Sequence, residues 1–504
     1  MRNPLRRLTF AFRDVTLGTV LDRLADANEG HRLVEESEGG LVLTYAQGAK
    51  RVRRWAAGVA TKAGPGDRVV IATPNGYEML LLSLAASRAG CLPVPVNPQL
   101  TRAELDHVVD DSDAKLVIRS AAEVDVVEQR PEAAPASPND VAALFYTSGT
   151  TGKPKGVSLT HRALVGGFSK AGVLPPMLTG RMECVMALPV SHIMGFAALL
   201  GMAASGIPVY LLPKFHPVKV LDAIESRRAT MYIGVPAMYR MMLEAGAEQR
   251  DLSSVRVWAS GADAMPHDIA ARYKKLGATA VLPVVGRVGE AAFVEGYGMV
   301  ETGGGAMGKV SPPFLGLGLG SDSFGFPLPG WRFKVVDPDT GAEVGRGRSG
   351  ELMVKGPGVT KGYWGDVEAS RVVTEDGWLR TGDMARLGPF GTVLFEGRAK
   401  DVIKVGGYSV YALEVERAIE EHPDVLEAVA VGIPDERKGE VVGAVVRLRD
   451  DVELDPGSLQ AFASERLGGY KVPEQWRAVD DLPRTGTNKV KKRELVGLFT
   501  LPRQ

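Results

Sequence analysis

The residue types best suited to chemistry lie in one short string, Tyr146-Thr-Ser-Gly-Thr-Thr-Gly-Lys-Pro-Lys-Gly156, which follows the apolar run Val141–Phe145. Its glycines let backbone N–H groups turn inward, its hydroxyls add donors, and its lysines add positive charge, so the string suits a polyphosphate. It is not a Walker loop, because it lacks the four-residue gap and the Ser or Thr after the Lys. Taken alone, such a string is more often an ordinary surface loop.

Further motifs occur downstream. They are Ser260-Gly-Ala-Asp263, Gly296-Tyr-Gly-Met-Val-Glu-Thr302, Trp378-Leu-Arg-Thr-Gly-Asp383, Gly397-Arg-Ala-Lys-Asp401, Gly406-Gly407-Tyr408 with Glu414 and Glu416, and Pro483-Arg-Thr-Gly-Thr-Asn-Lys489. Each has an ordinary interpretation by itself: Asp383 as a turn aspartate, Lys489 as part of a solvated basic run, and Tyr297 as a core aromatic. Their occurrence together and in order is what carries functional information.

In this order, the motifs resemble those of the adenylate-forming superfamily, which includes acyl-CoA synthetases, firefly luciferase and nonribosomal-peptide adenylation domains. The resemblance extends from about residue 43 to residue 495 and is strongest to the acyl-CoA synthetases and fatty-acid–CoA ligases. It implies an acid–thiol ligase with ATP and CoA as cosubstrates and Mg²⁺ as cofactor.

The resemblance also implies a role for each motif in the ATP site. Tyr297 would stack on adenine and Asp383 would accept hydrogen bonds from the ribose hydroxyls. The residues expected to bind ATP or AMP are Thr147, Ser148, Gly149, Thr150, Thr151, Gly152, Lys155, Gly261, Ala262, Asp263, Tyr297, Gly298, Asp383 and Arg398. The expected catalytic residues are Lys489, Thr302, Glu301 and His192, with Glu301 and Thr150 as metal ligands.

Joining a carboxylate to the α-phosphorus of ATP brings two anions together, so electrostatic clamping rather than a protein nucleophile should dominate catalysis. The chain also lacks the GxSxG elbow of the serine hydrolases. Adenylation needs Lys489 in the site, whereas attack by a thiol needs an open path. Rotation about a hinge at Lys400 would exchange Lys489 for the predicted CoA tunnel, formed by Gly406, Gly407 and Tyr408.

The segment Leu188-Pro-Val-Ser-His-Ile-Met-Gly-Phe196 resembles the acyl-site motif of acyl-CoA ligases, with His192 at the gate; a structural histidine after a strand is the alternative. Amino-acid adenylation domains carry an Asp where this chain has Ile193, so a free amino group would be buried unpaired. The segment 193–212 has no cation for a second carboxylate. We therefore expect an uncharged tail, in the first place a fatty one. The predicted acyl pocket comprises Met194, Gly195, Phe196, Val235, Met238 and Gly303.

Other functions remain open at this stage. An acyl-AMP ligase, an aryl-acid or cyclic-acid CoA ligase, or a homologue impaired in one half-reaction would share most of the motifs. Asn488 stands where the superfamily has a Gly, Asp263 stands where an uncharged residue is common, and the stretch Val284–Ala292 has no assigned role. The glycines of Gly316-Leu-Gly-Leu-Gly320 suggest a dinucleotide fold only weakly, because no helix can follow them.

Alternating strand and helix signals must position these motifs. Val69–Ala72, a helix over Glu78–Arg88 and a strand over Leu92–Val96 set the pattern, which predicts parallel sheets covered on both faces. Hairpin signals begin at Phe333, and an α+β pattern follows residue 397. We expect an α/β fold: residues 1–397 form a large domain of doubly wound parallel sheets with a small β-barrel-like part, and residues 398–504 a small mobile α+β domain.

Composition excludes other classes. The chain has 504 residues, of which 45% are hydrophobic and 24% charged, and its 60 basic residues balance its 60 acidic ones. A neutral chain has no global field to hold nucleic acid. Cys91 and Cys184 are expected to be buried thiols in a reducing compartment. With no predicted signal peptide or membrane span, a cytoplasmic location is expected, and peripheral membrane contact through the arginine-rich N-terminus remains an alternative.

Overall fold

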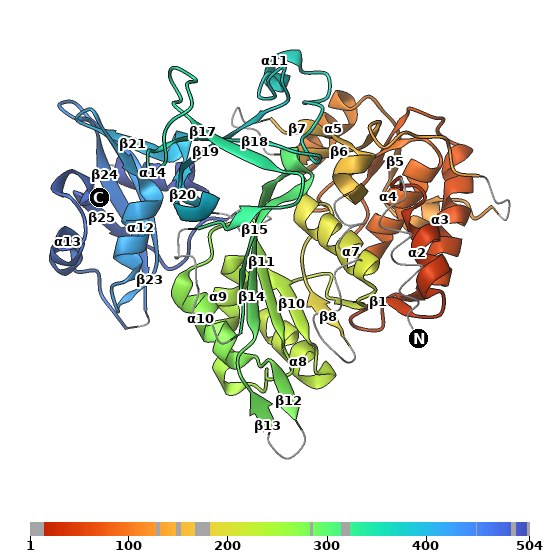
Figure 1. The fold of residues 1–504 in the computed structure, drawn as a ribbon, viewed down its shortest axis with the longest axis horizontal. Coiled ribbons are helices and arrows are strands. Elements are labelled where there is room, and N and C mark those ends of the chain that lie inside the picture. The colour runs from red at the N-terminus through yellow and green to blue at the C-terminus, as the bar shows by residue number, and fades with distance from the viewer. Residues whose placement is uncertain are drawn as a thin grey trace. The chain divides into compact units, whose positions relative to one another are not determined.

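The computed structural model describes residues 15–127, 132–147, 153–166, 182–282, 286–313, 323–449, 451–484 and 490–500 (Figure 1). The chain divides into two compact units. The first comprises 1–332 and 354–379, and the second comprises 333–353 and 380–504. The predicted boundary at 397/398 stays a prediction.

A nine-stranded sheet organises the first unit, in the order β16-β15-β14-β11-β10-β8-β9-β1-β2. The strands from β14 to β1 run parallel, whereas β15, β16 and β2 are antiparallel additions at the two ends. The strands are β1 (Arg32–Glu36), β2 (Val42–Thr44), β8 (Cys184–Met186), β9 (Val209–Leu211), β10 (Met231–Gly234), β11 (Val257–Gly261), β14 (Ala292–Met299), β15 (Gly304–Ser311) and β16 (Phe326–Pro327).

Both faces of this sheet are buried. Successive side chains along a strand point to opposite faces, so two neighbouring residues of one strand show what covers each face. In β10, Tyr232 packs in the cluster with α8, α9 and α10, whereas Ile233 packs in the cluster that contains α7. The prediction of a parallel sheet covered on both faces is therefore confirmed. The covering helices are α7 (Ile193–Ser205), α8 (Pro217–Arg227), α9 (Pro236–Glu244) and α10 (His267–Leu276).

A second, three-stranded parallel sheet, in the order β4-β3-β5, lies in the N-terminal part of the same unit. The helix predicted over Glu78–Arg88 forms as α4. Two further helices begin with capping boxes, made by Thr44 and Gln47 at α3 and by Thr101 and Glu104 at α5. Its elements are β3 (Arg68–Ile71), β4 (Leu92–Pro95), β5 (Ala114–Ile118), α2 (Val20–Asn28), α3 (Tyr45–Ala60), α4 (Tyr77–Arg88) and α5 (Arg102–Asp111).

Two hairpins complete the first unit. The hairpin of β6 (Val141–Thr147) and β7 (Lys155–Thr160) carries the polyphosphate string, whose residues 148–152 lie outside the described residues. The stretch without an assigned role contributes to a second hairpin, β12 (Ala280–Leu282) and β13 (Gly286–Val288). A short helix, α11 (Val367–Ser370), follows later in the chain.

The second unit contains two sheets, of which the four-stranded one has the order β17-β18-β19-β20 and the five-stranded one the order β22-β21-β24-β23, with β25 pairing β24. Helix α12 and helix α13 pack on the five-stranded sheet through an apolar cluster, as the α+β pattern predicts. The elements are β17 (Arg332–Val336), β18 (Gly350–Lys355), β19 (Leu379–Leu387), β20 (Val393–Arg398), β21 (Val402–Val405), β22 (Tyr408–Tyr411), β23 (Val425–Asp435), β24 (Gly439–Leu448), β25 (Gln475–Ala478), α12 (Ala412–Glu420), α13 (Pro456–Ser464) and α14 (Lys492–Thr500).

A buried histidine holds the start of the described chain against the β6–β7 hairpin. His161, which directly follows β7, is 4% exposed, and its Nδ1 accepts a hydrogen bond of 2.9 Å from the backbone N–H of Leu17. Burial lowers the pKa of His161 from 6.5 to about 4, although nearby Asp140 opposes the shift. Protonation of Nδ1 would remove this acceptor while placing a charge in the core.

Acid should therefore weaken this contact. A folded-state pKa of about 4 lies below the unfolded value of 6.5, so the contribution of His161 is complete above pH 6.5 and is lost as the pH falls towards 4. We expect about 2 kcal/mol less stability at pH 5 than at pH 7 from this group, measured by denaturant unfolding. His161→Asn, which has an acceptor that does not titrate, should flatten the difference, whereas exposed His31→Asn should not. An unchanged pH dependence in His161→Asn would contradict this origin.

Candidate active site

The β6–β7 hairpin ends at the predicted ATP residues Thr147 and Lys155, which form the last register pair of its two strands. The predicted loop residues Ser148, Gly149, Thr150, Thr151 and Gly152 lie outside the described residues, so their roles stay predictions. The Nζ of Lys155 is 2.9 Å from Oδ2 of Asp366 and 5.9 Å from the centre of the Tyr363 ring. Hydrogen bonds from the Ala369 amide and then Lys155 lower the pKa of Asp366.

A segment that sequence reasoning missed runs beside this hairpin. We call residues 358–366 the strap. The strap amide of Trp364 donates to the Gly156 carbonyl at 2.7 Å, and the Ser158 amide donates to the Gly362 carbonyl at 2.9 Å. The Thr360 amide donates to the carbonyl of Glu301 at 2.8 Å. The strap therefore joins the β6–β7 hairpin to the predicted catalytic turn. The glycine–aromatic string Gly362-Tyr-Trp-Gly365 was the available sequence signal.

The catalytic turn itself is a single 3₁₀ turn, η4 (Val300–Thr302), between β14 and β15. Thr302 is 1% exposed, and its hydroxyl oxygen accepts from the Met299 amide at 2.9 Å and lies 2.8 Å from the Gly304 carbonyl. The hydroxyl thus stabilises the turn, and its predicted contact with the α-phosphate stays a prediction. Glu301 is half-buried, and its Oε1 accepts a hydrogen bond of 2.8 Å from the Tyr363 phenol.

The predicted adenine residues lie where β11 ends beside β14, with Gly261 in register with Gly296. The next residue, Ala262, has φ +69, a backbone conformation that non-glycine residues adopt at a cost and that often marks a functional site. Asp263 accepts a hydrogen bond from the adjacent Ala264 amide at 2.8 Å. A Cβ on Gly298 would lie 1.5 Å from the Gly304 carbonyl oxygen, so no larger residue fits there.

Tyr297 packs against an aromatic residue that the motifs did not indicate. Its ring centre lies 4.7 Å from that of Phe324, and the rings are tilted by 30°. Aromatic pairs at this separation attract through dispersion and quadrupole terms. Phe324 therefore holds the predicted adenine-stacking ring in place.

Two residues of the predicted acyl pocket, Met194 and Gly303, lie in a group of small or apolar residues of the first unit that approach one another closely. A Cβ added at Gly261 would lie 3.5 Å from the Met194 methyl group. One at Gly304 would lie 3.4 Å from the Ala197 Cβ, and one at Gly303 would lie 3.1 Å from the Ala163 Cβ. We call these uncharged residues the acyl wall, and their contact with a substrate stays a prediction. Gly195 also allows a close approach, since its Cβ would be 2.1 Å from the Pro189 carbonyl oxygen.

Other predicted acyl residues lie deeper. Phe196 is fully buried and packs edge-to-face on Phe145, with ring centres 5.2 Å apart, and Val235 and Met238 belong to the same apolar cluster. His192 caps helix α7: its Nδ1 accepts from the Met194 amide at 3.3 Å. This contact gives His192 a structural role, and its gating role stays a prediction.

The second unit holds the predicted ribose carboxylate. Asp383 is 1% exposed, and its Oδ1 lies 2.8 Å from Nε of Arg398, its register partner on β20. Buried Glu351 accepts from the Gly382 amide at 3.2 Å and pairs with Arg380, which fixes the turn that carries Asp383. Burying a carboxylate requires such a partner, and Arg398 supplies it.

The remaining predictions for the second unit concern the hinge and the tunnel. Lys400 lies on an exposed turn after β20, and Gly406 and Gly407 have φ of +55 and +87. Tyr408 is 61% exposed and stacks on Tyr470 with ring centres 4.8 Å apart. Lys489 lies outside the described residues.

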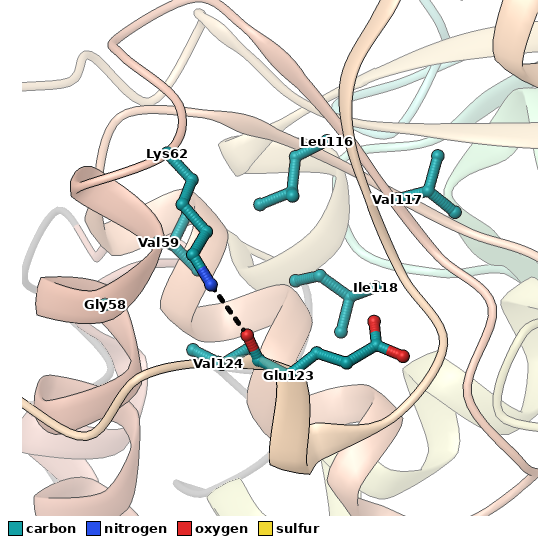
Figure 2. A pocket seen from close by; sticks show the side chains of 8 residues that line it. All are labelled: Gly58, Val59, Lys62, Leu116, Val117, Ile118, Glu123 and Val124. Carbon is teal, nitrogen blue, oxygen red and sulfur yellow. Dashed lines mark hydrogen bonds between the residues drawn. The ribbon is translucent and has the colours of Figure 1, made fainter.

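A cavity of about 160 Å³ lies away from all these residues, between the end of α3, strand β5 and the turn that follows it (Figure 2). Its walls are mainly aliphatic, and the Lys62 ammonium donates to the Glu123 carbonyl at 2.9 Å (Figure 2). The one lysine of the lining is thus already engaged. The cavity is lined by Gly58, Val59, Lys62, Leu116, Val117, Ile118, Glu123 and Val124.

Within the described ranges, no three His, Cys, Asp or Glu side chains gather as a metal site. Mg²⁺ ordinarily binds through one or two carboxylates together with substrate phosphates, and the half-buried carboxylate of Glu301 fits that pattern. None of the helices in the part of the chain that the structure describes is long and apolar enough to cross a membrane.

Comparison with known proteins gives a consistent result. Residues 21–364 match the AMP-binding enzyme family and residues 414–489 match the AMP-binding enzyme C-terminal domain. A feruloyl-CoA synthase of an Amycolatopsis species is 36% identical over 91% of this chain and 94% of its own length. A long-chain-fatty-acid–CoA ligase of Bacillus subtilis is 35% identical over 71% of this chain and 62% of its own.

Among solved structures, the ATP-bound MatB of Rhodopseudomonas palustris superposes with a TM-score of 0.83 at 29% identity, covering 96% of this chain and 99% of that one. The α/β fold with a smaller C-terminal domain, as predicted, is confirmed by this likeness. The two domain matches include the polyphosphate string, the predicted catalytic turn and Lys489, whereas the motifs at 378–383, 397–401 and 406–408 lie between them. The chain therefore belongs to the AMP-binding enzyme family of the adenylate-forming superfamily and is an AMP-forming acid–thiol ligase.

Proposed function

We propose that the protein activates an uncharged, aryl-substituted carboxylic acid with ATP and transfers the acyl group to CoA. The observation that carries the choice of tail is the similarity to a feruloyl-CoA synthase, which is 36% identical over 91% of this chain. The acyl wall, where Ala197 faces Gly304 and Ala163 faces Gly303, is uncharged, which fits a tail without a charge.

In the first step, an oxygen of the substrate carboxylate would attack the α-phosphorus as the bond to pyrophosphate breaks. Both reactants are anions, so the protein lowers the barrier by placing cations around them. Lys155 and Lys489 would supply positive charge, and Asp383 would orient the ribose. Glu301 would bind Mg²⁺, which supplies charge neutralisation at the phosphates.

In the second step, the CoA sulfur would attack the acyl carbonyl, the thiol proton would pass to solvent, and AMP would leave. No protein nucleophile is needed, because the adenylate is already an activated acyl donor. The predicted tunnel residues Gly406 and Gly407 would let the thiol approach along bare backbone.

A fatty tail, which the sequence favoured, is the second candidate and is supported by the 35% identity to the Bacillus subtilis ligase. An acid panel separates the two. We expect ferulic and coumaric acids to give at least tenfold higher kcat/KM than fatty acids of 8 to 16 carbons, measured as AMP release with and without CoA. The reverse order would establish the fatty assignment. Acid-dependent pyrophosphate release without CoA, with no AMP released when CoA is added, would instead indicate an acyl-AMP ligase.

The acyl wall should not tolerate a methyl group at Gly303. Gly303 has φ +64, and a Cβ there would lie 2.9 Å from the Ala163 carbonyl oxygen. Gly303→Ala should lower kcat/KM for the acid roughly tenfold or more, because strain of about 1–3 kcal/mol falls on the catalytic turn. Gly39→Ala is the control: Gly39 has φ +75 with nothing within 4 Å of a Cβ. Equal activity of the two variants would contradict this use of Gly303.

Lys489 should be needed for the first half-reaction and not for the second. We expect Lys489→Ala to abolish acyl-adenylate formation, measured by pyrophosphate exchange, and to retain thioester formation from supplied acyl-adenylate. Lys491→Ala is a matched control in the same basic run, since Lys491 pairs with Glu494 at 2.9 Å. Loss of both half-reactions to the same degree in Lys489→Ala would refute the division of labour.

A further inference from the structure

The strap forms the physical link between two parts of the nucleotide site, and its Tyr363 points at the carboxylate of the catalytic turn. The phenol oxygen lies 2.8 Å from Oε1 of Glu301, across 62 residues of sequence. The Tyr363 phenol is the donor of this hydrogen bond, and the Glu301 carboxylate is the acceptor.

The phenol is not required to hold the strap. The backbone of Tyr363 is already fixed, because its amide donates to the Ser370 hydroxyl at 2.9 Å. The Thr360 hydroxyl oxygen lies 2.8 Å from the Ser158 carbonyl, which pins the strap to β7. The backbone of Glu301 is held separately by the Thr360 amide. What the phenol adds is therefore control of the Glu301 side chain.

The Glu301 side chain has rotatable bonds, and binding a metal ion restricts them. A hydrogen bond that already holds the carboxylate reduces the conformational freedom that is lost on binding. Groups that hydrogen-bond a ligating carboxylate orient it, and their loss ordinarily costs 10- to 100-fold in metal affinity or activity. Lys155, which pairs with Asp366, lies 5.9 Å from the centre of the Tyr363 ring, whereas the hydroxyl of the same ring bonds Glu301.

We propose that Tyr363 is a positioning residue that holds the Glu301 carboxylate in the orientation in which it binds the Mg²⁺ accompanying ATP. This role rests on the proposed function, because it assumes that ATP and Mg²⁺ occupy the site. Tyr363 itself touches neither reacting group.

The test is calorimetric titration of ATP into the full-length protein at graded Mg²⁺ concentrations. For Tyr363→Phe we expect the half-saturating Mg²⁺ concentration to rise about tenfold. ATP affinity without Mg²⁺ should stay within twofold of wild type, and saturating Mg²⁺ should restore the affinity. Tyr45→Phe is the matched control: it removes a buried phenol bond, to the Ala203 carbonyl at 2.7 Å, in the same unit. Its melting temperature should fall while its Mg²⁺ titration matches wild type.

A double-mutant cycle isolates the pair. Glu301→Gln should by itself weaken the Mg²⁺ dependence, and Tyr363→Phe in that background should add no further shift. A tenfold shift that persists in Glu301→Gln, or a Tyr363→Phe titration within twofold of wild type, would overturn the role of Tyr363. If wild-type protein takes up no nucleotide at any Mg²⁺ concentration, the proposed function itself fails, which is a separate outcome.

Discussion

Backbone hydrogen bonding between the β6–β7 hairpin and the strap determines the geometry of the predicted nucleotide site in the first unit. These bonds join residues near 156 to residues near 362, and a further one joins Thr360 to Glu301. Buried backbone groups must be paired, so the three segments cannot separate without exposing unmet donors and acceptors. The charged side chains of the site project from this frame, and their positions follow from it.

A second constraint is the absence of side chains where segments approach closely. A Cβ at Gly358 would lie 2.3 Å from the Thr302 carbonyl oxygen, and one at Gly298 would lie closer still to that of Gly304. These glycines do not serve flexibility, because their neighbours are packed. They let the backbones of the strap and of strand β15 pack directly against the predicted catalytic turn. As a result, Thr302 is almost fully buried and Glu301 is partly accessible.

The sequence indicates candidate site residues more readily than it indicates their structural partners. Glu301, Asp383 and Lys155 could be named as candidates because each belongs to a contiguous motif with a characteristic composition. Tyr363 and Phe324 could not be named from the sequence. Each contacts its partner from a distant segment of the chain, and local sequence patterns do not indicate such contacts. The parallel sheets followed from the strand–helix alternation, as Tyr232 and Ile233 packing on opposite faces shows. The sequence could not distinguish the two roles considered for His192, because a helix-capping histidine and a gating histidine would both stand directly after a strand.

The ion pair of Lys155 with Asp366 bears on how a polyphosphate would enter. A bare ammonium surrounded by water would have to shed its hydration shell on meeting a phosphate. Lys155 has already exchanged part of that shell for a carboxylate at 2.9 Å, so an incoming phosphate would replace one anion by another. In such an exchange the carboxylate of Asp366 would be hydrated again. The affinity of Lys155 for a phosphate would then depend on the difference between its interaction with the phosphate and its interaction with Asp366.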